Sequence, residues 1–212
     1  MNSTDFKKLK QSFRYWVLGK AEHDPEYYKV LEALEVAEKY HVGKRKDGQP
    51  EFSHQIAICS FLRTIHKYFK DPVSVFIVAL LHDTPEDYKE SIPEIEQRFP
   101  KQAPMTICIS KVRNGEKIPY ETYFGGMKDC HVCSIVKLAD RIANISTMLG
   151  VFTLEKQDKY LKDLEDWFLP MLKYAKRMFP EQEPAYENMK TILILQRDLI
   201  LKTRIDVQNN KG

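Results

Sequence analysis

The chain has 212 residues, of which 43% are hydrophobic and 30% are charged. These proportions are typical of a globular protein with one hydrophobic core, and they exclude a largely disordered chain. The net charge of +3 arises from well-mixed basic and acidic residues. Nucleic acid is therefore not predicted as a partner, whereas a basic pocket for an anionic small molecule is compatible with this charge.

No segment of the sequence predicts secretion or membrane insertion. Residues 1–20 mix charged with apolar residues and lack the apolar core of a signal peptide. The longest apolar run, from Val73 to Leu81, is too short to span a bilayer. The four cysteines are too few to indicate a disulfide framework in a chain of this length. We predict a soluble, cytoplasmic protein without a membrane partner, and a homo-oligomer stays open.

Apolar residues recur at helical spacing along most of the chain. In chain order, such faces run over residues 9–17, 30–37, 58–69 and 135–149. Two long helices are predicted near 156–178 and 184–204, with Pro180 and Pro184 at the break between them.

The apolar run Val73–Leu81 suits either a buried strand or a buried helix, because periodicity alone does not separate the two. Hairpin signals are nearly absent apart from a turn at residues 113–115. We therefore predict a core helix here and an all-α fold. The expected organisation is one domain, with an N-terminal helical extension (1–25), a core (26–155) and C-terminal helices packing on that core (156–212).

Four polar residues are candidates for one metal site. His82 and Asp83 end the most apolar segment, where burying both is costly unless they are bonded or bound to a metal. His54 begins another amphipathic segment, and Asp140 lies on the polar edge of a third. Two imidazoles with two carboxylates suit a divalent transition metal. Each residue alone is more simply explained as a helix cap or surface group, so the hypothesis depends on all four together.

Other polar residues near these four have two interpretations. Asp140, Asn144 and Thr147 share one helical stripe, which is either a solvated face or a ridge that contacts a ligand. Glu86 and Asp87 are either an acidic cluster at a helix start or carboxylates that take a proton from water.

Four blocks of sequence resemble the hydrolase domain of RelA/SpoT-type proteins, a branch of the HD-domain phosphohydrolases. They are Gly43-Lys-Arg-Lys-Asp-Gly-Gln-Pro-Glu-Phe-Ser-His54, Ala79-Leu-Leu-His-Asp-Thr-Pro-Glu-Asp87, Ile92-Pro-Glu-Ile-Glu-Gln-Arg-Phe99 and Val136-Lys-Leu-Ala-Asp-Arg-Ile-Ala-Asn-Ile-Ser-Thr147. The blocks occur in the family's order over roughly residues 30–150, which is far more specific than a lone HD dipeptide.

The resemblance implies an HD-domain helical bundle that hydrolyses the 3′-pyrophosphate of the alarmones ppGpp and pppGpp in the stringent response. It implies one divalent metal, most simply Mn²⁺ with Fe, Zn, Co or Ni as alternatives, and a nucleotide as the small-molecule substrate. The metal ligands would be His54, His82, Asp83 and Asp140, the catalytic carboxylates Glu86 and Asp87, and the substrate contacts Arg45, Lys46, Asn144 and Thr147.

The sequence departs from the family pattern in places. Asp47 stands where the family usually has Ser, Cys108-Ile-Ser-Lys111 replaces a Gly-Val-Thr-Lys stretch, and Ile142-Ala143-Asn144 replaces a frequent Leu-His-Asn. Two alternatives therefore remain. The chain could be an HD hydrolase of another nucleotide, such as an adenine alarmone or a deoxynucleoside triphosphate, or a catalytically silent module that binds a nucleotide.

The sequence Cys130-His-Val-Cys133 has the C-x-x-C spacing of some metal and redox sites. No second pair completes a zinc site. We interpret the two cysteines as packing residues at the start of a helix.

Overall fold

The computed structural model describes residues 3–113 and 115–209. Its α-helices are α1 (Ser3–Ala21), α2 (Tyr28–Tyr40), α3 (Ser53–Ile65), α4 (Pro72–Leu81), α5 (Thr84–Asp87), α6 (Ile92–Arg98), α7 (Ala103–Cys108), α8 (Tyr120–Lys128), α9 (His131–Met148), α10 (Leu154–Asp163), α11 (Leu169–Met178) and α12 (Glu183–Asn209). Short 3₁₀ turns cover Pro25–Tyr27, His66–Tyr68, Lys89–Ser91 and Pro180–Gln182. The prediction of an all-α fold is confirmed.

A two-residue hairpin is the one piece of sheet in the described residues. Strand β1 (Val112–Arg113) pairs antiparallel with β2 (Glu116–Lys117). The turn predicted at residues 113–115 lies at this hairpin, although Asn114 itself is outside the described residues. Gly115 has a φ of 85°, a backbone conformation that glycine adopts without steric cost.

Helix α4 is the buried centre of the N-terminal half. Asp71 caps it by accepting a hydrogen bond from the Ser74 amide, and Pro72 occupies its first turn, where no N–H is needed. Every residue from Val73 to Leu81 is buried, because α2, α3, α7 and α9 all pack around the helix. A helix covered on all sides has no polar face. The prediction of a core helix is confirmed, and the missing periodicity is explained.

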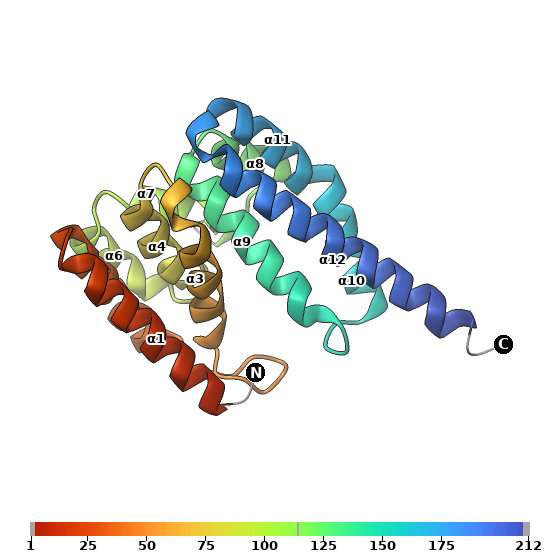
Figure 1. Ribbon diagram of the computed structural model, residues 1–212, viewed down its shortest axis with the longest axis horizontal. Coiled ribbons are helices and arrows are strands. Elements are labelled where there is room, and N and C mark those ends of the chain that lie inside the picture. The colour runs from red at the N-terminus through yellow and green to blue at the C-terminus, as the bar shows by residue number, and fades with distance from the viewer. Residues whose placement is uncertain (1–2, 114, 210–212) are drawn as a thin grey trace.

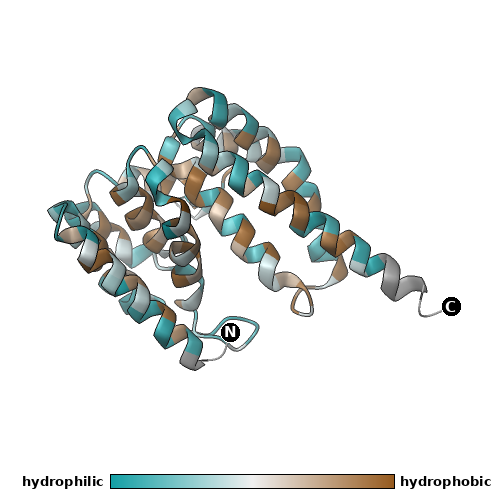
Figure 2. Ribbon diagram, in the orientation of Figure 1, coloured by the Kyte–Doolittle hydropathy of each residue, from teal (hydrophilic) through white to brown (hydrophobic). Residues whose placement is uncertain are grey.

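Helix α9 lies between the two halves of the molecule (Figure 1). It packs against α3 and α4 on one side and against α8, α11 and α12 on the other. Apolar and polar positions alternate along α9 and α12 (Figure 2), as the amphipathic spacing predicted. One cluster of buried apolar side chains runs from Phe6 to Ile200, so the N-terminal and C-terminal helices share a core with the helices between them.

The first of the two long C-terminal helices contains a change of pitch. It begins as α10, passes through a π-helical segment (Leu164–Phe168), and continues as α11. Pro170 follows this segment and has no N–H to donate to the carbonyl of Asp166. The Leu169 amide instead bonds the carbonyl of Leu164, five residues back. The wider turn explains how the helix continues past a proline.

Candidate metal centre and nucleotide pocket

Three elements bring the four candidate metal ligands together. His54 is the second residue of α3, His82 and Asp83 follow the last residue of α4, and Asp140 lies in the middle of α9. The contacts of α4 and α3 with α9 therefore fix the relative positions of the four side chains.

The distances between these side chains are short. The Nε2 atom of His54 lies 3.0 Å from Oδ1 of Asp140 and 3.9 Å from Oδ2 of Asp83. The Nε2 atom of His82 lies 3.0 Å from Oδ2 of Asp83 and 3.7 Å from Oδ1 of Asp140. His54, His82 and Asp140 each offer a ligand atom within 4.8 Å of the other two. Both imidazoles and the Asp140 carboxylate thus converge on one point, and the Asp83 carboxylate lies beside the two imidazoles.

The Asp140 carboxylate is held by further contacts. Lys137, one turn earlier on α9, places its Nζ 2.8 Å from Oδ2, and the Asn144 amide donates a hydrogen bond to Oδ1. Lys137 and Asp140 are both buried. A buried carboxylate needs such compensation, and a fixed orientation is what a metal ligand requires. Asn144, predicted as a substrate contact, therefore also orients a candidate ligand.

The two histidines differ in protonation. Burial lowers the pKa of His54, and its hydrogen bond with Asp140 opposes this shift only in part. The His54 imidazole is therefore neutral, the form that can bind a metal. Burial would also lower the pKa of His82, but the charge of Asp83 and the contacts with Asp140 raise that pKa to about 10. The Nδ1–H of His82 donates to the carbonyl of Ala79 at 2.9 Å. That bond leaves Nε2 directed at the cluster.

These residues fit a divalent transition metal. Nε2 of His82 is buried without a hydrogen-bond partner, although the Asp83 carboxylate is 3.0 Å away. The carboxylate thus lies off the direction that a hydrogen bond needs. Imidazole nitrogen with carboxylate oxygen is a donor set for Mn, Fe, Co, Ni or Zn, and both groups bind as their deprotonated forms.

We expect metal binding at this cluster to release about one proton near neutral pH, because His82 carries a proton in the metal-free protein. Because the pKa of His82 is raised, the proton competes with the metal until the pH approaches about 10. Affinity should therefore rise with pH by up to about tenfold per unit. Calorimetric titrations in buffers of different ionisation enthalpy measure this release. An observed enthalpy that does not vary with the buffer would contradict it.

The two predicted catalytic carboxylates lie on α5, one helical turn after Asp83. Glu86 is partly buried, and its Oε2 accepts a hydrogen bond of 2.7 Å from the backbone N–H of Lys111. Asp87 is more exposed. Partial burial and the charges of Asp83, Glu86 and Glu51 raise the pKa of Asp87 to about 6. One carboxylate is thus fixed in place, and the other titrates near neutral pH.

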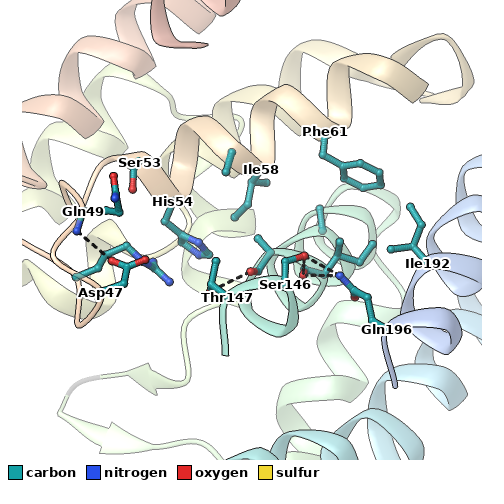
Figure 3. A pocket seen from close by; sticks show the side chains of 15 residues that line it. Asp47, Gln49, Ser53, His54, Ile58, Phe61, Ser146, Thr147, Ile192 and Gln196 are labelled. Atoms are coloured by element: carbon teal, nitrogen blue, oxygen red, sulfur yellow. Dashed lines mark hydrogen bonds between the residues drawn. The ribbon is translucent and has the colours of Figure 1, made fainter. Parts of the chain in front are cut away.

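A pocket of about 420 Å³ opens beside His54. One end is polar and is formed by Asp47, Gln49, Ser53 and His54. The other is mainly apolar, with Ile58, Phe61 and Ile192 beside Ser146 and Gln196 (Figure 3). Such a volume, with one apolar and one polar end, is typical of a small-molecule site.

The predicted substrate residues line this pocket and its neighbour. Arg45 and Thr147 line both, whereas Lys46 and Asn144 line only the adjacent one. The Thr147 hydroxyl donates to carbonyls of its own helix. Arg45 is half-buried and Lys46 is exposed on the loop before α3.

Two further basic residues near the site were not predicted. Lys156 on α10 lines the adjacent pocket with Arg45 and Lys46, and its pKa is lowered by partial burial and by those two charges. Burial and the charges of Lys137 and Arg141 lower the pKa of Lys111 to about 8. Lys111 could have been found from the sequence, because it ends the stretch Cys108-Ile-Ser-Lys111 that replaces the family's Gly-Val-Thr-Lys. No motif of the sequence includes Lys156. Together these cations make the site favourable for a multiply charged anion.

Comparison with known proteins finds relatives that bear two kinds of name. A GTP pyrophosphokinase of Streptomyces coelicolor is 30% identical over 67% of this chain and 17% of its own length. A guanosine-3′,5′-bis(diphosphate) 3′-pyrophosphohydrolase of Aquifex aeolicus is 31% identical over 70% of this chain and 22% of its own length. The chain therefore spans about a fifth of these relatives. No family model matches it.

Among solved structures, a metazoan ortholog of SpoT that hydrolyses ppGpp superposes with a TM-score of 0.55 at 21% identity. The match covers 83% of this chain and 95% of the other. It shows a common helical fold over most of both chains. Together with the named relatives, it confirms the resemblance to the RelA/SpoT type of HD hydrolase. None of the helices in residues 3–113 and 115–209 combines the length and hydropathy of a membrane span.

Proposed function

We propose that this chain, a relative of the RelA/SpoT-type HD hydrolases, is a metal-dependent 3′-pyrophosphohydrolase of guanosine alarmones. It would convert ppGpp and water to GDP and pyrophosphate, and pppGpp to GTP and pyrophosphate. The observation that carries the proposal is the convergence of His54, His82 and Asp140, with Asp83 next to His82, beside a pocket with a basic loop. Mn²⁺ is the first candidate metal. A cytoplasmic location and a homo-oligomer remain predictions.

The proposed chemistry divides between the metal and the side chains. His54, His82, Asp83 and Asp140 would hold a divalent cation, which supplies polarisation of phosphate oxygens and lowers the pKa of water towards ~7. Arg45 offers a planar guanidinium for phosphate oxygens, and Lys46 and Lys156 add point charges. Glu86, fixed by the Lys111 amide, would take the proton of the attacking water. Asp87, on the same short helix as Glu86, would pass a proton to the departing group.

The direct test is incubation of the purified, Mn²⁺-loaded chain with a panel of nucleotides, followed by chromatography of the products. Release of pyrophosphate from the 3′-position of ppGpp is the expected result. Release of triphosphate from a deoxynucleoside triphosphate, or preference for an adenine alarmone, would instead support an HD hydrolase of another nucleotide. Nucleotide binding without any product would support the silent module.

Asp47 is the residue of the pocket that bears on the choice of base. It lies on the loop that carries Arg45 and Lys46, and its carboxylate accepts a hydrogen bond from the Gln49 amide. A carboxylate can accept hydrogen bonds from a base edge but repels a phosphate. The wall of the pocket at Asp47 is therefore better suited to a base or ribose, whereas the diphosphate would lie at Arg45 and the metal beside His54.

Replacing Glu86 by glutamine should leave metal content unchanged and reduce kcat by about 10²-fold or more. The glutamine oxygen still accepts the Lys111 amide, so the change removes a proton acceptor rather than a structural contact. Steady-state kinetics and metal analysis measure the two effects. Glu90→Gln is the matched control, because Glu90 is exposed four residues later. Equal kcat in the two variants would remove Glu86 from the mechanism.

A further inference from the structure

Three of the four cysteines gather at one place that the proposed hydrolysis does not use. Cys130 is the N-cap of α9, Cys133 lies in the first turn of the same helix, and Cys108 ends α7. All are free thiols. Contact of α7 with α9 brings Cys108 to the C-x-x-C pair, so that both of those cysteines influence the pKa of Cys108.

The two thiols of the C-x-x-C pair have different environments. The Sγ of Cys130 accepts a hydrogen bond of 3.3 Å from the backbone N–H of Cys133, and it is partly exposed. Cys133 is fully buried, and its Sγ lies 3.5 Å from the carbonyl of Met105. One sulfur is thus accessible to a reagent, while its neighbour is protected from solvent. In thiol–disulfide exchange, an accessible thiol such as Cys130 attacks first, and a protected neighbour such as Cys133 then completes the disulfide.

The pKa values of Cys130 and Cys133 differ in the same direction as their exposure. The neighbouring Cys133 thiol, with the amides of Cys133 and Val132, lowers the pKa of Cys130 to about 6, which favours its thiolate form. The contacts with Cys108 and Cys130 and burial raise the pKa of Cys133. Cys133 and Arg113 also lower the pKa of Cys108, to about 7. Cys133 has a single S–H, so it can donate to only one of the two sulfurs at a time. Cys59, elsewhere in the core, has its pKa raised by burial.

The arrangement favours a dithiol over a metal site. Among the described residues, one group of three or more His, Cys, Asp or Glu has its ligand atoms all within 4.8 Å of one another. It consists of His54, His82 and Asp140. The three sulfurs do not meet that condition, whereas thiolates that share a zinc ion converge around it at about 2.3 Å each. The packing interpretation describes Cys133, which is buried, and in part Cys130, which packs against the core but keeps some exposure.

We propose that Cys130 and Cys133 form a reversible oxidation site that reacts with low-molecular-weight disulfides such as glutathione disulfide. The Cys130 thiolate attacks one sulfur of the disulfide and expels one glutathione thiolate, which leaves a mixed disulfide on Cys130. Cys133 then loses its proton and attacks the Cys130 sulfur, expelling the second glutathione. The two cysteines are oxidised by two electrons, and glutathione disulfide is reduced to two thiols. Excess reduced glutathione reverses both steps.

The test uses the full chain, exposed to glutathione disulfide and then alkylated and digested with trypsin. Cleavage after Lys128 and Lys137 releases one peptide that contains both Cys130 and Cys133, whereas Cys108 lies on another peptide. The expected product is a disulfide within the first peptide, lost on treatment with reduced glutathione. A disulfide that joins the two peptides would overturn the assignment, as would a chain that stays fully reduced.

Variants separate the two roles. Cys133→Ser should stop at the mixed disulfide on residue 130, and Cys130→Ser should prevent reaction. In the unmodified chain, Cys130 should be alkylated at neutral pH at least about tenfold faster than Cys59, which is the matched buried thiol. Comparable rates at the two positions would contradict the proposal. Zinc retained by the reduced chain but not by Cys130→Ser would replace it with a metal site.

Discussion

Replacing Asp83 by alanine is expected to abolish metal binding and turnover together. The Asp83 carboxylate lies within 3.0 Å of His82 and 3.9 Å of His54, so its loss removes one of two anionic ligands and the charge nearest the second imidazole. The variant keeps both imidazoles and Asp140 but has lost half of the carboxylate charge that would face the cation. Calorimetry for the metal and product chromatography for turnover measure the two losses on one preparation.

Asp166→Ala is the matched control for this variant, because Asp166 is exposed and pairs only with Lys162 on the surface. It should keep both activities. Circular dichroism checks that the Asp83 variant is folded, which its partly exposed position favours. Unchanged turnover in Asp83→Ala would end the metal hypothesis. Lost turnover with intact metal binding would assign Asp83 another role.

Replacing Lys137 by methionine is expected to destabilise the metal-free protein by about 3–5 kcal/mol, the usual cost of leaving a buried charge without its partner. Lys137 and Asp140 are 5% and 6% exposed, so solvent does not replace the lost cation. A divalent ion at the cluster supplies positive charge to the same carboxylate. Adding metal should therefore recover part of the loss, by the linkage of ligand binding to folding.

Urea denaturation in the presence of a chelator, and again with saturating Mn²⁺, measures both parts of this expectation. Lys162→Met is the control, because the ion pair of Lys162 with Asp166 is at the surface and such pairs contribute little. If the two variants lose equal stability, Lys137 does not compensate Asp140. If Mn²⁺ made the loss of stability in Lys137→Met larger, the Lys137 ammonium and the metal would not be acting on the same carboxylate.

The sequence was sufficient for the fold class, and it named the four candidate ligands that lie near one another in the structure. The apolar run before His82 can exist in a folded chain only if it is covered on all sides, and α4 is covered in that way. His54, His82-Asp83 and Asp140 each stand at a recognisable point of an amphipathic or buried segment. Their convergence could be inferred from the resemblance, but not from spacing alone.

What the sequence could not give depends on contacts between distant segments. Lys156 became a neighbour of Arg45 only through the packing of α10 beside the loop before α3. Cys108 joined the C-x-x-C pair because α7 ends against the start of α9. Asn144 had been assigned to substrate from the family resemblance, and only the positions of its neighbours show that it also bonds Asp140.

The enclosure of α4 has a consequence for how the chain fluctuates. The backbone amides of a helix packed against four others exchange with solvent only when large parts of the structure open. His82 and Asp83 follow this helix directly, so thermal fraying of a terminus or a loop does not displace them. Their geometry is thus maintained by the same cooperative unit that maintains the whole protein, and it persists until that unit unfolds.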